Sequence, residues 1–325
     1  MSSSRRGERE QSCAAAWGVS AHRLPKRPIS MEIMMLSRTK TLASLVLGLS
    51  VLLEAAAPAG ATSWTPPGVT MGLTLGAALP PGIYVSNLLH YGDGPDKTVT
   101  AEIPGFTWST GKEFLGAQYS AALILEGLNL HFKNPKSINK SGIFSPLLVP
   151  VSLSWNLGQG YFVSVSEGVM FPFDSDVSLT TAGETSGWAA ETRVAFSYLK
   201  DGWVISANTI FGATTPDDVG RKQPDYFNVD WSVAHTFGKW QVGVVGYGAW
   251  DLETTVTNSA AGAGHIAGVG GLVGYDFGGA KLLVELTHAV EQGGTTNYSR
   301  NDTHIWTRLS FPIWRPESEQ SASLK

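Results

Sequence analysis

Residues 145–171 read SPLLVPVSLSWNLGQGYFVSVSEGVMF, and their alternation predicts two β-strands joined by a tight turn. Successive side chains of a strand face opposite sides, so each half has one apolar face and one small, polar face. The turn is Gly158-Gln159-Gly160, because glycine tolerates the positive φ that tight hairpins need. The apolar face is expected to hold Leu147, Val149, Val151, Leu153, Trp155, Leu157, Tyr161, Val163, Val165, Val169 and Phe171, opposite Ser152, Ser154, Asn156, Ser164 and Ser166.

The composition narrows the chain to two all-β classes. Charged residues make up 15% of the 325 residues, whereas about a quarter is usual in soluble domains. Glycine (37) and aromatic residues (11 Trp, 9 Tyr and 13 Phe) are frequent. This combination fits a β-sandwich or a membrane barrel. The single cysteine, Cys13, excludes a disulfide framework.

The first 61 residues have the pattern of an export signal. In order, they contain Arg38 and Lys40, the apolar run Leu42–Leu53 and the small-residue cleavage site Ala59-Gly60-Ala61. We therefore expect a signal peptide over residues 31–61, with translation starting at Met31, Met34 or Met35. Residues 1–30 would then be a disordered extension, or one that is not part of the translated protein. A cytoplasmic tail on a membrane anchor is the alternative interpretation.

Cleavage after Ala61 would leave an acidic chain. Residues 1–61 hold 8 of the 23 basic and 4 of the 27 acidic residues, so the chain from Thr62 onward has 15 basic and 23 acidic residues, a net charge of −8. Such a chain binds nucleic acid poorly, and we expect no nucleic-acid partner. No later stretch is long and apolar enough for a transmembrane helix, so a membrane location would require a closed barrel.

A proline-rich lead-in over residues 62–81, which would partly plug a barrel lumen, precedes twelve expected strands within 82–314, and a tail over 315–325 follows them. The strands are expected at 82–91, 99–109, 113–131, 145–157, 160–171, 189–199, 202–212, 225–237, 240–251, 265–277, 280–291 and 302–314. Near Glu126-Gly127 the alternation changes phase, which indicates a bulge or a strand break. After the first loop, short turns alternate with longer polar connections, as in outer-membrane barrels with short periplasmic turns and long external loops. An even strand number puts both termini on the periplasmic side.

The polar strand faces carry isolated charges among Ser, Thr, Asn and Gly, which is the composition of a water-filled lumen. The charged side chains expected to line it are Glu191, Arg193, Asp230, Lys281, Glu285 and Arg308. Opposite charges across a lumen form a constriction that selects permeants; alternatively, they pair and brace the wall. Aromatic residues near the strand ends predict interfacial girdles, or the core of a sandwich: Trp155, Tyr161, Trp188, Trp203, Phe237, Trp240, Trp250, Tyr275 and Trp314.

The sequence offers little for catalysis or metal binding. Asp174 and Asp176 could give oxygen ligands to Ca²⁺, but two carboxylates are too few. The histidines lack metal-ligand spacing. His235 and His288 fall on the apolar face, as in an outer-membrane phospholipase, yet neither has the serine nucleophile two residues later. We expect no catalytic residue, no metal and no cofactor.

Several segments resemble the family of outer-membrane proteins named for the meta-pathway of phenol degradation, over most of residues 79–314. They are Leu79-Pro80-Pro81-Gly82-Ile83-Tyr84-Val85-Ser86-Asn87, Pro150–Gly160 with Ser154-Trp155 and Leu157-Gly158, Gly168–Pro172 and Arg308-Leu309-Ser310-Phe311-Pro312-Ile313-Trp314. The resemblance implies an outer-membrane β-barrel that takes up hydrophobic or aromatic compounds. One departure is the tail after Trp314, since outer-membrane barrels usually end at an aromatic residue.

The sequence thus predicts an all-β transmembrane barrel of about twelve antiparallel up-and-down strands in the bacterial outer membrane. Its function would be passive transport of small hydrophobic or aromatic compounds. The expected partners are outer-membrane lipids, the permeant and the barrel-assembly machinery. A non-conducting structural or adhesive barrel is the second hypothesis, and an outer-membrane lipase is the third.

Overall fold

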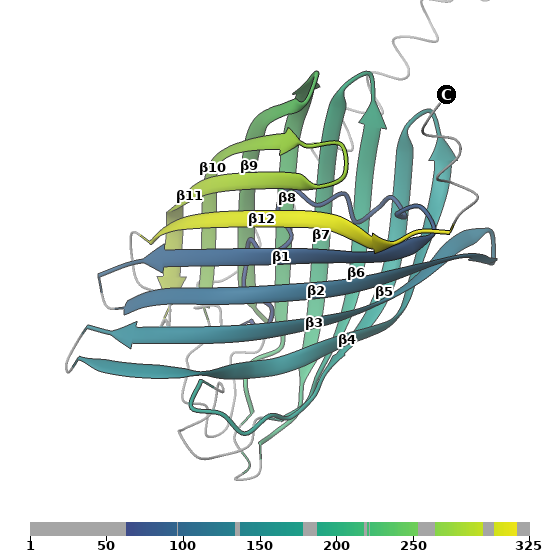
Figure 1. The fold of residues 1–325 in the computed structure, drawn as a ribbon. Helices are drawn as coiled ribbons and strands as arrows, with labels where there is room; N and C mark the ends of the chain where they lie inside the picture. Colours follow the sequence, from purple (N-terminus) through teal and green to yellow (C-terminus); the bar gives the residue numbers. More distant parts are fainter. Residues whose placement is uncertain are drawn as a thin grey trace, which may run out of the picture. The chain divides into compact units, whose positions relative to one another are not determined.

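The chain from Gly82 to Trp314 forms a closed barrel of twelve antiparallel strands in which each strand pairs with its neighbours in sequence. The last strand pairs with the first, and this closes the sheet (Figure 1). The computed structural model describes residues 63–95, 97–133, 137–177, 187–217, 220, 222–252, 264–294 and 302–316. The expected extension, the signal peptide and most of the tail lie outside these residues. No helix among the described residues is long and apolar enough to cross a membrane.

The strands are mostly 10 to 16 residues long, and two of them, β2 and β4, extend further. Their bounds are β1 Gly82–Asp93, β2 Lys97–Phe114, β3 Ala117–Phe132, β4 Ile138–Gly158, β5 Tyr161–Met170, β6 Ala189–Lys200, β7 Trp203–Thr214, β8 Tyr226–Phe237, β9 Trp240–Asp251, β10 Gly264–Asp276, β11 Lys281–Gly294 and β12 Thr303–Trp314. The predicted number of strands and their antiparallel order are confirmed. At β2, β3 and β4 the predicted bounds were wrong by several residues.

Tight turns lie at one end of the barrel, which we call the turn end; the opposite end is the loop end. Leu115 and Gly116, between β2 and β3, both have positive φ, and the same holds for Asp201 and Gly202 between β6 and β7. The sequence pattern placed the β2–β3 turn near residues 110–112. The structure instead continues β2 to Phe114, because only the Leu115-Gly116 pair adopts the left-handed geometry of a two-residue turn.

The hairpin β4–β5 corrects one prediction. A register shift between Leu148 and Val151 reverses the alternation within β4. Leu147 and Val149 are therefore buried on the inner face, while Val151 lies on the exterior and is 40% exposed. The uninterrupted apolar row predicted from Leu147 onward is wrong because a bulge adds a residue and turns the strand over. The strand β3 is continuous and keeps its alternation near Glu126, so the predicted bulge or break in β3 is wrong; the register shift beside Ile124 and Glu126 comes from an extra residue in the neighbouring β4.

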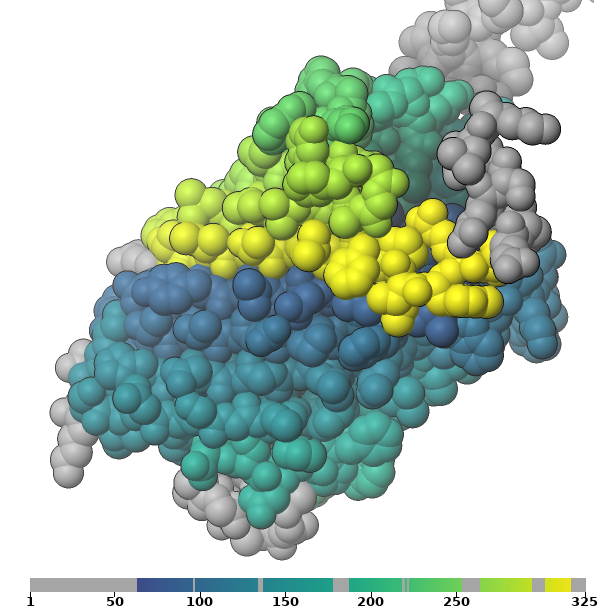
Figure 2. All heavy atoms as spheres, in the orientation of Figure 1, coloured from purple at the N-terminus to yellow at the C-terminus, as the bar shows by residue number. Residues whose placement is uncertain are grey.

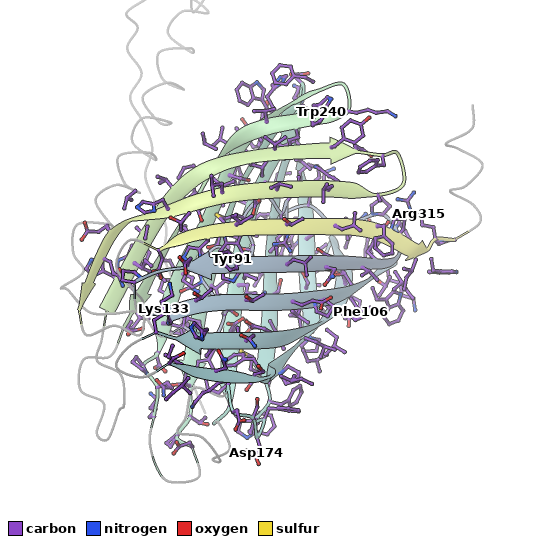
Figure 3. The ribbon with its side chains drawn as sticks, turned by 60° about the vertical axis from the view of Figure 1, so that its left-hand side comes forward. Tyr91, Phe106, Lys133, Asp174, Trp240 and Arg315 are labelled. Carbon is purple, nitrogen blue, oxygen red and sulfur yellow. The ribbon has the colours of Figure 1, made fainter. Side chains whose placement is uncertain are left out.

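The exterior is apolar, as expected for a transmembrane barrel. Val194 and Phe196 of β6 are exposed outside, whereas Glu191 and Ser197 are fully buried inside. Figure 2 shows the last strand packed along the first with no break in the surface, and in Figure 3 Tyr91, Phe106 and Trp240 project outward. Exposed aromatic side chains gather near the turn end, at Trp108, Phe114, Tyr161, Trp203, Phe237, Trp240, Phe277 and Trp314, and near the loop end, at Tyr91, Phe173, Trp188 and Phe211. They form the two girdles of a membrane barrel.

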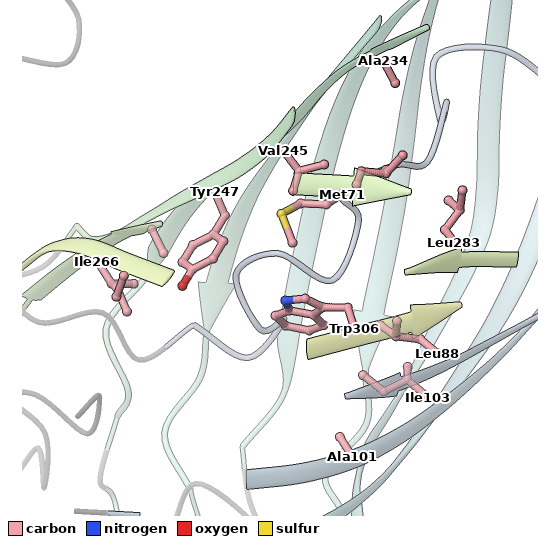
Figure 4. Close-up of a cluster of buried hydrophobic side chains, with 13 residues drawn as sticks. Met71, Leu88, Ala101, Ile103, Ala234, Val245, Tyr247, Ile266, Leu283 and Trp306 are labelled. Atoms are coloured by element: carbon pink, nitrogen blue, oxygen red, sulfur yellow. The ribbon is translucent and has the colours of Figure 1, made fainter. Parts of the chain in front are cut away.

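Residues 63–81, which we call the plug, run inside the barrel without regular secondary structure. In Figure 4 Met71 of the plug inserts between Trp306 of β12 and Val245 of β9. Met71 is fully buried in a cluster with Leu88, Leu272 and Leu283. Burial of such a side chain contributes about 1.5–3 kcal/mol. The plug is therefore part of the core on the β8–β12 side of the barrel.

Candidate permeation path

Asp230 holds the middle of the plug. Its Oδ1 accepts a hydrogen bond from Gly68 N at 2.7 Å, and its Oδ2 accepts from Thr70 N at 2.8 Å and Thr70 Oγ1 at 2.7 Å. Gly68 has a φ of +94°, which only glycine adopts easily. Three donors satisfy a carboxylate that is 1% exposed, so the charge is compensated by the plug backbone and a hydroxyl.

Glu191 forms a second anchor nearer the loop end. Its Oε1 accepts hydrogen bonds from Thr65 Oγ1 and Tyr226 OH, both at 2.5 Å, and its Oε2 accepts one from Arg193 Nε at 2.9 Å. Arg193 also forms an ion pair with Glu191 and donates to Thr65. This arrangement joins β6, β8 and the plug in one buried polar network.

Small polar side chains of the barrel hold the rest of the plug through its backbone. Asn208 of β7 donates to Thr70 O at 2.9 Å. Closer to the turn end, Ser154 donates to Gly76 O at 2.7 Å, and Ser164 donates to Leu75 O at 2.8 Å. Ser154 and Ser164 of the β4–β5 hairpin thus bind the plug, whereas Ser152 and Ser166 hydrogen-bond to each other.

The other three predicted lumen residues lie on β11 and β12. Arg308 is buried and donates to the plug carbonyl of Val69. Glu285 is 1% exposed, and its Oε1 has no hydrogen-bond partner among the described residues. Lys281 lies near the turn end and lines a cavity. The structure therefore brings Glu191, Arg193, Asp230 and Arg308 to the plug, and it leaves Lys281 apart.

The plug does not fill the lumen. A cavity of about 520 Å³ lies between the plug and the barrel wall, where it is lined by residues of β1–β7, β11 and β12 and extends to the turn end. Its wall mixes aliphatic side chains with serine hydroxyls. The aliphatic members include Leu73, Leu75, Ile124, Leu147 and Val149, and the serines include Ser120, Ser145, Ser152, Ser154, Ser164 and Ser166.

A smaller cavity of about 170 Å³ lies toward the loop end. His90, His304 and Trp306 line it. His90 Nε2 lies 2.9 Å from His304 Nδ1, and the His90 ring stacks on Trp306 with centroids 3.8 Å apart. The two histidines are one donor–acceptor pair and do not form a metal site: the described residues contain no group of three or more metal-ligating side chains.

Glu126 of β3 is the residue that sequence reasoning missed. It is 8% exposed. Among the described residues, two line both cavities: Glu126 itself and, from the plug, Pro66. The alternation of β3 places Glu126 on the inner face, two residues after Ile124, because the register of β3 with β2 continues unbroken past it. The apparent change of phase at Glu126-Gly127 concealed this position, although Glu126 lies an even number of residues from Ala122 and Ile124, which line the same cavity.

The remaining candidates for chemistry are dispersed. Asp174 and Asp176 are exposed beyond β5. His235 packs against Trp203 and Phe237 at the turn-end girdle, and His288 contacts Thr303 Oγ1 at 2.9 Å. None of these side chains lies in either cavity.

Comparison with known proteins agrees with this architecture. The family model described as "Putative MetA-pathway of phenol degradation" matches residues 85–308. The structure is similar to an outer membrane channel from Pseudomonas putida F1, with 11% sequence identity, a TM-score of 0.58 and coverage of 74% of this chain and 98% of that chain. At that identity the likeness shows a shared fold.

Two further structures match less well. The NanC porin has 10% identity and a TM-score of 0.44, with 70% of this chain and 100% of that chain covered. A mutant of the TodX monoaromatic hydrocarbon channel has 11% identity and a TM-score of 0.43, with 80% and 97% covered. No match was found among the curated proteins.

Proposed function

The chain belongs to the family of the MetA-pathway of phenol degradation, and we propose that it is a passive outer-membrane channel for small hydrophobic or aromatic compounds. The apolar exterior with two aromatic girdles suits a lipid bilayer. The interior combines two apolar clusters with polar side chains, a fixed plug and free volume beside the plug. This is the construction of a channel with a restricted path.

The observation that carries the proposal is the pair of adjoining cavities. The larger one opens toward the turn end and the smaller one toward the loop end, and both are bordered by Glu126 and Pro66. Together they follow the inner wall of the barrel past the plug. A lumen packed solid with side chains would favour a structural or adhesive barrel, and the free volume speaks against that alternative.

The wall of the larger cavity fits the proposed permeants. Aliphatic side chains bury an apolar body, and serine hydroxyls accept or donate hydrogen bonds without a fixed charge. The volume of about 520 Å³ lies within the range of small-molecule sites. A passive path requires weak binding, and the neutral serine hydroxyls suit release as well as uptake; the same wall also carries charged side chains, among them Arg193, Lys281 and Arg308.

Planar bilayers test the proposal. The refolded protein should produce discrete conductance steps, and millimolar benzyl alcohol should interrupt the ion current because it occupies the same cavities. A protein-free bilayer with benzyl alcohol is the control. The absence of both steps and interruptions over many insertions would reject a channel and leave the non-conducting barrel.

Export and assembly complete the proposal. We infer that residues 31–61 direct export as a signal peptide and that outer-membrane lipids then surround the barrel. The barrel-assembly machinery would close β12 onto β1. Truncation after Trp314 tests the contribution of the tail: correct insertion should persist, because β12 already makes its full pairing with β1 before Arg315.

A further inference from the structure

We propose that Glu126 is the polar binding residue of the permeation path. It would take a small neutral molecule that combines an apolar body with one hydrogen-bond donor, such as an alcohol. The inference rests on the proposed channel function and specifies what its path selects. None of the six charged residues expected from the sequence borders both cavities, as Glu126 does.

The first observation is that Glu126 is buried and has no partner. It is 8% exposed, and none of the hydrogen bonds or ion pairs of the described residues includes it. Asp230 and Glu191, which are 1% and 0% exposed, each accept three or more hydrogen bonds. A buried carboxyl group without a partner costs several kcal/mol in general, so its retention calls for a reason other than stability.

The second observation is the location of the carboxyl group. Glu126 borders both cavities, and across from it the plug presents Pro66, with Pro67 lining the smaller cavity. Proline has no backbone N–H. At this point the plug backbone therefore has no donor for the carboxyl group, in contrast to Gly68 and Thr70 at Asp230. The acceptor stays available to a molecule in the path.

The surroundings define the rest of the ligand. Glu126 pairs across the sheet with Phe144, which is 4% exposed. The Phe144 ring packs edge-on against the Trp64 ring of the plug, with ring centroids 5.9 Å apart. Ile124 and Leu147 are opposite each other in the next inward positions. An apolar body would contact these side chains while its hydroxyl group donates to Glu126. A hydrocarbon of the same shape would leave the carboxyl group without a partner.

Ligand binding to the full barrel in detergent micelles tests this inference by ¹⁹F NMR. The probes are 4-fluorobenzyl alcohol and 1-ethyl-4-fluorobenzene, which have nearly the same shape and differ in the hydroxyl group. Protein-free micelles give the background. In Glu126→Leu we expect affinity for the alcohol to fall about tenfold, as for loss of one buried hydrogen bond, while affinity for the hydrocarbon holds or rises.

Two further variants make the result decisive. Glu291→Leu removes an exterior carboxylate that is 68% exposed and should bind both probes like the unaltered protein. Glu126→Gln keeps an acceptor oxygen and should lose less alcohol affinity than Glu126→Leu; it also replaces that variant if the leucine form does not fold. Equal affinity for the alcohol in all variants would overturn the inference. Selective binding without bilayer conductance would overturn the channel function and leave the Glu126 site standing.

Discussion

At the residue scale, the buried carboxyl groups of this barrel have different roles, which depend on the hydrogen-bond donors around them. Asp230 has three donors from the plug, whereas Glu126 has none among the described residues. One side chain stabilises the fold, and the other costs stability while it keeps an acceptor free in the path. Substitutions that remove each carboxylate should therefore change stability in opposite directions.

Asp230→Asn should destabilise the barrel by about 2–4 kcal/mol. The amide nitrogen of asparagine cannot accept from Gly68 or Thr70, so at least one buried donor loses its partner. Urea unfolding in micelles, followed by tryptophan fluorescence, measures the change. Ser166→Ala, which loses a single hydrogen bond to Ser152, is the milder control. An unaltered midpoint in Asp230→Asn would show that the plug is not held at this position.

Glu126→Leu should stabilise the same barrel by about 1–3 kcal/mol, because it removes a buried polar group that has no partner. The same urea titration measures the gain, with Glu291→Leu as the exterior control. A loss of stability would mean that the carboxyl group is satisfied in the folded protein, and the argument for a vacant acceptor would fail.

At the scale of elements, alternation predicts strands well and bulges poorly. In β6 and β8 every second residue faced the side that the pattern indicated, since those strands pair without a register shift. In β4 the pattern failed between Leu148 and Val151, because one extra residue reverses the faces without changing the composition. Pro150 was the available clue: proline cannot donate to the ladder and concentrates at bulges.

Cysteine labelling of β4 tests the reversal of faces. In a Cys13→Ser background, Val149→Cys should react with a water-soluble thiol reagent through the lumen, while Val151→Cys should react only with a lipid-soluble maleimide. The reason is that Val149 lines the larger cavity and Val151 faces outward. Equal labelling of both positions by the water-soluble reagent would contradict the bulge.

The plug escaped sequence analysis in its details because it lacks periodicity. The prolines of residues 62–81 indicated a lead-in, but the partners of Thr70 and Gly76 lie more than 70 residues away in sequence. The alternation correctly predicted that charged side chains such as Asp230 and Arg308 lie on the inner face. It did not indicate that they bind the plug. Their effect on which molecules pass remains a prediction.

Gly76→Val should raise single-channel conductance at least twofold. A Cβ at Gly76 would lie 2.6 Å from Ser197 N, and that backbone cannot move without breaking β6, so the plug must shift away from the wall. Conductance in planar bilayers measures the effect. Gly271→Val is the control, because its Cβ would meet a single atom, Gly243 O, at 4.0 Å. Unchanged conductance in Gly76→Val would show that this part of the plug does not limit the path.

At the scale of the whole molecule, the even number of strands and the distribution of turns fix an orientation. The short turns after β2, β4, β6, β8 and β10 lie at one end together with the end of β12 at Trp314. Outer-membrane barrels keep short turns in the periplasm and long loops outside. Residues such as Asp174, beyond the loop end of β5, would then face the medium (Figure 3), and the larger cavity would open toward the periplasm.

Labelling of intact cells decides this orientation. A membrane-impermeant maleimide should modify Asp174→Cys in whole cells, because this exposed side chain lies among the external loops. It should modify Asp201→Cys, in the β6–β7 turn, only after the outer membrane is permeabilised, since that turn faces the periplasm. The reverse pattern would invert the barrel, and the cavity bordered by Ser154 and Ser164 would become the outer mouth of the path. Molecules from the medium would then meet the serine-rich wall before Glu126, whereas in the expected orientation they first pass His90 and Trp306.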